Sequence, residues 1–185
     1  MTMFPSTPIG PCEIWAGTTQ ALAAKICDTV GGAELTYTEE YATSKMDKTG
    51  NRARAKVVIG GECKVTGAAG EATIAQLASL TGQSADTGDT RLGLGARTGT
   101  NLRDDAQVVI LKPIIEGVVS VTDADWFVIP AATFEVNWAI SFTVDGQRSY
   151  GFIIEGHPVT ADEVATGGRI VDEGFVENQI LVLGD

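Results

Sequence analysis

The sequence predicts an all-β fold: an antiparallel β-sandwich or barrel with one short flanking α-helix. Three observations support this. At least six segments alternate apolar and polar residues with period two, or form short apolar runs, as strands do. Only one segment has apolar residues at helical spacing. Strands and helices do not alternate along the chain, which argues against a parallel sheet of βαβ units.

The chain has 185 residues, 44% of them hydrophobic and 20% charged. This length suits a single domain, 1–185, and this composition excludes an intrinsically disordered chain. No apolar run approaches the roughly 18–20 residues that span a bilayer, and residues 1–10 lack the pattern of a secretory signal. We therefore expect a protein made in the cytoplasm without a membrane partner. Cys12, Cys27 and Cys63 show no metal-binding spacing, and we expect ordinary thiols.

The first predicted strand covers residues 33–41, where apolar and polar residues alternate and Glu39 is the exception on the apolar side. Residues 42–53 are polar, with a turn expected near 49–51. The chain returns through a strand at 54–59, so a hairpin arm is predicted at about 42–56. Gly60 and Gly61 then indicate a bulge or bend.

Residues 71–81 form the predicted helix. Its apolar stripe consists of Ile74, Leu77, Ala78 and Leu80, with Glu71 in the first turn and Gly82 after the end. Three turns of amphipathic helix are expected to cover one sheet face. Residues 83–105 are rich in Gly, Thr, Asp and Arg and are predicted to be an exposed loop.

The second half contains an apolar strand at 106–115 and a long hairpin made of residues 133–144 and 147–155. A three-residue loop at 144–146 pairs Ile140 with Tyr150 and Trp138 with Phe152. This register keeps the large apolar groups on one face, which a two-residue turn does not. An acidic exposed loop at 159–175 and a terminal strand at 180–183 complete the prediction.

The sequence contains only weak motifs for catalysis, phosphate binding or metal binding. His157 is the only histidine, and nothing near it resembles a nucleophile elbow. The glycine-rich stretch at 93–100 lacks the lysine of a phosphate-binding loop. Neighbouring carboxylates point to opposite faces of a strand, and no calcium-loop pattern is present. We therefore expect no catalytic residue, no metal and no cofactor, and a protein that is not an enzyme.

The charge is distributed unevenly. The net charge is -11 with a pI of about 4.4, so binding of nucleic acid through phosphate neutralisation is not expected. Residues 1–70 are neutral overall, whereas residues 106–185 carry -9. One basic cluster lies in the arm and is opposed only by Asp47: Lys45, Lys48, Arg52, Arg54 and Lys56. The cluster is either a solvated hairpin or a docking arm that meets an acidic surface of another copy, head to tail.

The order of these elements resembles the major tail tube proteins of long-tailed, siphovirus-like bacteriophages. The resemblance covers about half of the chain and implies a β-sandwich or barrel of the tail-tube type. It is carried by GGAELTYTEEYATSKMDKTGNRARAKVVIGGECKVTGAAGEATIAQLASLTG (31–82), AQVVILKP (106–113), FVIPAATFEVNWAISFTVDGQRSYGFIIEG (127–156) and ILVLGD (180–185).

The resemblance implies a structural virion protein of the phage tail, assembled in the host cytoplasm. Such proteins form hexameric rings that stack into a tube, and each subunit adds strands to a continuous inner barrel. DNA passes through the tube during ejection without specific binding. The implied partners are other copies of the chain, tail terminator and tail tip proteins, and a tape measure protein in the lumen. The arm is expected to contact the next ring.

A tube that conducts DNA needs a wall that does not hold phosphate, which acidic and hydroxyl side chains provide. Two polar strand faces are candidates for this wall, and the alternative is an ordinary solvated outer face. They consist of Glu34, Thr36, Thr38 and Glu40, and of Glu135, Asn137, Ser141 and Thr143.

Three other functions fit parts of the pattern. A tube protein of a contractile secretion or injection device shares the sheet architecture. A β-sandwich module that decorates a capsid or binds a ligand shows the same alternation without forming rings. An acidic hydrolase is the enzymatic alternative, although it lacks a recognisable nucleophile motif.

Overall fold

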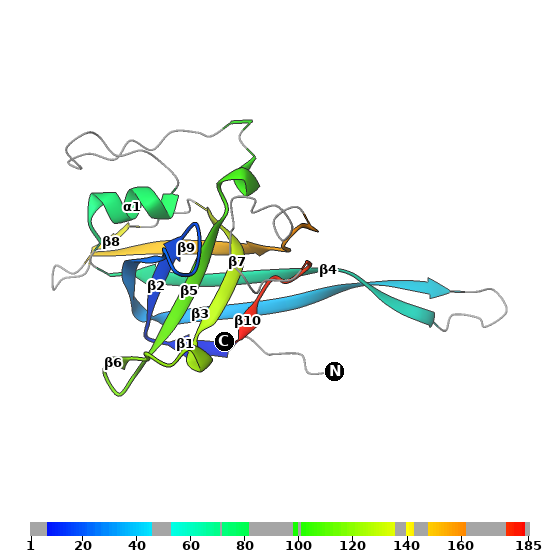
Figure 1. The fold of residues 1–185 in the computed structure, drawn as a ribbon, viewed down its shortest axis with the longest axis horizontal. Coiled ribbons are helices and arrows are strands. Elements are labelled where there is room, and N and C mark those ends of the chain that lie inside the picture. Colours follow the sequence, from blue (N-terminus) through cyan, green and yellow to red (C-terminus); the bar gives the residue numbers. More distant parts are fainter. Residues whose placement is uncertain are drawn as a thin grey trace.

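The computed structural model describes residues 7–45, 53–70, 72–81, 98–99, 101–135, 140–142, 148–161 and 177–183. Antiparallel strands dominate these residues, and one short α-helix lies beside them (Figure 1). The predicted all-β class is therefore confirmed.

The central feature is a closed barrel. Each strand pairs with the next in a cycle, and the last pairs again with the first. In order around the barrel the strands are β2 (Cys12–Gly17), β3 (Ala24–Lys45), β4 (Ala53–Ala69), β9 (Arg148–His157), β7 (Phe127–Glu135) and β5 (Gln107–Ile115). Closure removes free edges where the strands meet, and it encloses one face of every strand.

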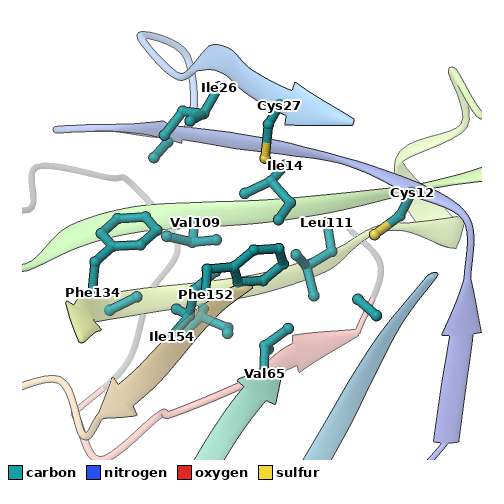
Figure 2. Packing of buried hydrophobic residues seen from close by; sticks show 14 of the residues in the cluster. Cys12, Ile14, Ile26, Cys27, Val65, Val109, Leu111, Phe134, Phe152 and Ile154 are labelled. Atoms are coloured by element: carbon teal, nitrogen blue, oxygen red, sulfur yellow. The ribbon is translucent and has the colours of Figure 1, made fainter. Parts of the chain in front are cut away.

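The interior of the barrel is packed with apolar side chains from all six strands. Ile14, Val65, Leu111, Ile129 and Ile154 are fully buried. Figure 2 shows Phe134, Val109, Phe152 and Ile154 in one cluster between the strands. A second apolar layer lies on the other face of β5 and β7 and contains Val108, Ile110 and Val128. Both faces of β5 are thus buried, which explains its nearly continuous apolar sequence.

Strands β3 and β4 are longer than the barrel and leave it together as a two-stranded ribbon (Figure 1). Pairing continues to Lys45 opposite Ala53. The register shifts between Glu40 and Tyr41, with Ile59 as the extra residue beside Gly60, so the predicted bulge is confirmed. Glu39 lies beyond the barrel and is exposed. No core lies beside this position, and this explains why an acid can stand on the apolar side of the strand pattern.

The aromatic hairpin has two registers. In β8 (Ile140–Phe142), Ile140 lies opposite Tyr150, which confirms the predicted pair. In β7, Phe134 lies opposite Ile154. This pairing is shifted by two residues from the register in which Ile140 lies opposite Tyr150. Trp138 and the turn at 144–146 fall outside the described residues. One continuous strand was predicted at 133–144. The structure describes two strands there: β7, which begins earlier at Phe127, and the short β8.

Helix α1 (Ile74–Thr81) packs against β3 and β7, with Leu77 and Ala78 buried as expected. It begins three residues later than predicted. Thr73 Oγ1 accepts from the Gln76 backbone N–H at 3.3 Å, and Gln76 Oε1 accepts from the Thr73 N–H at 2.8 Å. This capping box fixes the helix start. No helix in the described part of the chain is both long and apolar enough to cross a membrane.

Several elements were not predicted. They are β1 (Thr7–Gly10), β2, the first part of β3, β6 (Val118–Val119), and the 3-10 turns η2 (Leu102–Asp105) and η3 (Asp123–Asp125). The terminal strand β10 (Val182–Leu183) was predicted at 180–183 and pairs with β7. Most of the loop predicted at 159–175 lies outside the described residues. The described residues on either side of it are joined, since the Asn178 N–H donates to the Val159 carbonyl at 2.8 Å.

The two faces of β9 provide a stability test. Ile154 is fully buried in the barrel, whereas its neighbour Ile153 lies on the outer face and is half-buried. We expect Ile154→Ala to lower the free energy of unfolding by about 2–5 kcal/mol because it leaves a cavity. Ile153→Ala is the matched control and should cost clearly less. Urea unfolding measures both, and equal losses would contradict the assignment of the faces.

Candidate functional site

The two predicted polar faces lie on one continuous surface. Glu34 of β3 lies opposite Thr66 of β4, Thr66 opposite Ile153 of β9, and Ile153 opposite Glu135 of β7. Directly opposed residues share a sheet face. This row of paired residues connects β3 to β7 through β4 and β9, although β3 and β7 contribute residues about a hundred positions apart in sequence. The sequence analysis did not connect these two segments.

A second row runs parallel to the first. It contains Thr36, Lys64, Glu155 and Thr133 on the same four strands. We call the surface built on these rows the polar sheet face. Its described members are Glu34, Thr36, Thr38, Glu40, Glu62, Lys64, Thr66, Thr133, Glu135, Ile153, Glu155 and His157.

Carboxylates and hydroxyls dominate the polar sheet face. Lys64 is its single lysine among the described residues, and it lies between Thr36 and Glu155 on the neighbouring strands. Glu34, Thr38 and Glu40 are exposed, and Glu135 and Glu155 are half-buried. The surface is therefore strongly negative, and its only lysine has an acid as cross-strand neighbour.

Some predicted members are not described. Asn137 and Thr143 lie outside the described residues, and Ser141 lies in β8 opposite Ser149. The members from β4 and β9 were missed, although alternation in both strands was visible. Glu62 and Lys64 flank the buried Cys63, and Glu155 follows the buried Ile154.

His157 closes one end of the polar sheet face. Its Nε2 lies 2.8 Å from Oγ1 of the buried Thr133. The pair satisfies two polar groups at the edge of an apolar cluster, as buried polar groups require. Elsewhere in the described chain, no three His, Cys, Asp or Glu side chains converge on a point where a metal ion could sit.

The arm is the second candidate surface. Of its predicted basic residues, Lys45 and Arg54 lie in the paired strands, whereas Lys48 and Arg52 fall outside the described residues. Lys56 Nζ lies 3.6 Å from the centre of the Tyr41 ring. The Tyr41 hydroxyl donates to Glu39, a hydrogen bond that raises the pKa of Tyr41. Lys56 is thus held over the ribbon by a cation–π contact.

From here on, the arm means the whole ribbon of β3 and β4 beyond the barrel, which includes residues 57–59. It also exposes apolar surface, which the sequence analysis did not single out. Val57, Val58 and Ile59 are each more than half exposed. Val57 and Val58 point to opposite faces of the ribbon, so both faces are partly apolar. A two-stranded ribbon is marginally stable alone. This surface is therefore well suited to burial against another molecule.

The edges of the ribbon are free. Beyond Leu35, β3 pairs only with β4 among the described residues, and before Cys63, β4 pairs only with β3. Both strands therefore present backbone N–H and C=O groups that a further strand could pair with. These free edges adjoin the polar sheet face, because Thr36 to Glu40 belong to both.

A lysine between two indole rings was also missed by the sequence reasoning. Lys112 Nζ lies 4.0 Å from the centre of the Trp15 ring and 3.8 Å from that of Trp126. Burial lowers the pKa of Lys112. The indole N–H of Trp15 donates to the nearly buried Glu13 at 2.9 Å, and Lys25 contacts the same carboxylate at 2.6 Å. The cluster joins β2, β3, β5 and the start of β7.

No protein-family model matches this chain, and a search of curated proteins finds no match either. The functional argument therefore depends on the polar sheet face, the arm and the free strand edges.

The three cysteines give a prediction about pH. All are buried free thiols, and burial raises the pKa of Cys27 and of Cys63 to about 12 and raises that of Cys12 as well. The folded state holds these protons more tightly than the unfolded state, whose thiols titrate near 9.0. This contribution to stability is complete below pH 9 and is lost as the pH rises from about 9 towards 12.

We expect the native protein to resist thiol reagents at pH 8 and to react fully after unfolding. Urea titrations at pH 8, 9 and 10 should give a falling free energy of unfolding. A variant with Ser at Cys27 and at Cys63 provides the control, since its slope over this pH range should be smaller. Rapid labelling of the native thiols at pH 8 would contradict the expectation.

Proposed function

We propose that this chain is the major subunit of a phage tail tube, which assembles as stacked hexameric rings and conducts DNA. The observation that carries the proposal is the polar sheet face. One continuous four-stranded surface, backed by a packed core, carries mostly Glu and Thr, together with Ile153, His157 and a single described Lys.

The proposed role of this face is to line the lumen. DNA bears one negative charge per ~1.7 Å of duplex, and each phosphate paired with Lys or Arg adds affinity through counterion release. A wall of carboxylates and hydroxyls offers no such pairing. Duplex DNA therefore meets repulsion from the wall instead of binding sites, and it can slide.

The proposed route to a ring is edge-to-edge addition. The free edges of β3 and β4 adjoin the polar sheet face, so pairing with neighbouring copies extends that face around a hole. Main-chain hydrogen bonds between subunits and burial of Val57 and Val58 supply the association energy. Surface ion pairs contribute only about 0–1 kcal/mol each, so the charges of the arm mainly orient the subunits.

The primary test is electron microscopy of purified protein at high concentration. Rings and hollow tubes are the expected result, and a strict monomer would instead favour a binding module. Reversal of Glu34, Glu135 and Glu155 to Lys should leave assembly intact, and the tubes should retain duplex DNA about tenfold or more tightly at low salt.

The matched control is Glu177→Lys, because Glu177 is exposed but lies outside the polar sheet face. Tubes of this variant should behave as wild type in a DNA filter-binding assay. Equal DNA retention by both variants would count against a lumen on this face.

The arm gives a separate prediction. Reversal of Lys48, Arg52 and Arg54 to Glu should block tube growth and leave the monomer folded, because the arm then repels an acidic neighbour. Sedimentation velocity measures assembly, and circular dichroism measures folding. The arm has no docking role if this variant polymerises normally.

A further inference from the structure

The hairpin between β5 and β6 exposes apolar side chains at its tip. Ile115 lies opposite Val118, so these side chains share a face, and they are 53% and 69% exposed. The turn is formed by Glu116 and Gly117 with φ of 53° and 82°, as in a type I′ turn. Val121 follows and is 88% exposed. We call this surface the hairpin patch; it contains Ile115, Glu116, Val118, Val121, Asp123 and Asp125.

The hairpin patch is held in one conformation. The Ser120 N–H donates to the Pro113 carbonyl at 2.8 Å, and the Ser120 hydroxyl donates to Asp125 at 2.6 Å. The Trp126 indole N–H donates to the Ser120 carbonyl at 2.9 Å, and Lys112 lies against the Trp126 ring. An apolar surface that is already ordered loses little conformational entropy when it binds.

The hairpin patch and the arm are complementary in charge. Glu116, Asp123 and Asp125 are exposed acids, and the sequence has no Lys or Arg between residues 113 and 126. The arm combines exposed Val57 and Val58 with Lys56 and the rest of the basic cluster. Each surface thus joins apolar contact area to one sign of charge, and the signs are opposite.

The two surfaces also lie far apart on the molecule. In Figure 1 the arm extends to one end of the longest axis, and β6 lies at the other end. They cannot meet within one copy in this arrangement. Complementary surfaces at opposite ends of a chain make a head-to-tail contact that repeats from copy to copy.

We propose that the hairpin patch is the surface on which the arm of a second copy of this chain docks. The proposal rests on the proposed function and identifies the acceptor for the arm. Val58, which shares a face of the ribbon with Lys56, packs against Ile115 and Val118 of the next copy. Lys56 lies towards the acids at the rim of the contact, where charge fixes orientation.

The first test removes the apolar contact. Ile115→Thr combined with Val118→Thr keeps β-branched side chains, so the hairpin should stay folded. The critical concentration for polymerisation should rise about tenfold or more, because roughly two buried side chains lose apolar contact. Leu22→Thr is the matched control, since Leu22 is 70% exposed in the turn at the far end of β2. An unchanged critical concentration in the double variant would overturn the proposal.

The second test exchanges the charges. Glu116→Lys and Lys56→Glu should each raise the critical concentration, and the variant with both changes should return towards wild type. Rescue identifies a contact, because general loss of folding cannot be repaired by a second reversal. Glu177→Lys should not rescue Lys56→Glu. Equal rescue of Lys56→Glu by Glu116→Lys and by Glu177→Lys would contradict a contact between Lys56 and Glu116.

Cysteine cross-linking gives a result even if a variant assembles poorly. The native thiols are buried, so new surface cysteines react alone. Val58→Cys with Val118→Cys should yield a ladder of oxidised oligomers, whereas Val58→Cys with Leu22→Cys should not. If wild type forms tubes but the Val118 pair gives no ladder, the acceptor is wrong and the tube function stands. If wild type forms neither rings nor tubes, the proposed function fails and this proposal fails with it.

Discussion

The structure depends on closure of the barrel. Six strands surround one apolar interior, so each must present a continuous apolar face inward, and the period of a strand then sends alternate residues outward. On β5 and the first part of β7 the outer face is covered by a second apolar layer. On β3, β4, β9 and the end of β7 this layer is absent, and there most of the described outward residues are Glu, Thr and Lys, with Ile153 among them. The polar sheet face is thus a consequence of closure combined with one-sided covering.

A second constraint is the length of β3 and β4. These strands run past the barrel, and the interior that their inward residues would face ends near Tyr37. Beyond that point both faces of the ribbon meet solvent, although Val57, Val58 and Ile59 are apolar. The Tyr41 ring under Lys56 supports the ribbon only weakly, since an exposed cation–π contact contributes about 0.5–1 kcal/mol. In the proposed assembly, burial between copies would link the stability of the arm to polymerisation.

Charge and apolar area have different roles in this molecule. The negative charge is large, but the described ion pairs, Lys25 with Glu13 and with Asp28, are few and local. Apolar contact contributes about 25 cal/mol per Å² whatever the salt, whereas exposed charge is screened within about 10 Å at 0.1 M salt. In the proposed tube, apolar and main-chain contacts would therefore drive assembly of a net negative subunit, and charge would select orientation and keep polyanions mobile.

The sequence by itself determined the antiparallel class, the pairing of Ile140 with Tyr150, the apolar stripe of α1, and which residues face inward in part of β3, in β9 and at the end of β7. These features depend on residues close together in the chain. It did not reveal β2, which is short and contains the nearly buried acid Glu13. Trp15 of the same strand and Lys25 of β3 satisfy this carboxylate. Only the tertiary structure decided that Glu34 and Glu135 share one surface. Their relation depends on which strands lie between them, and strand order is set by long-range closure around a shared core, which local periodicity does not encode.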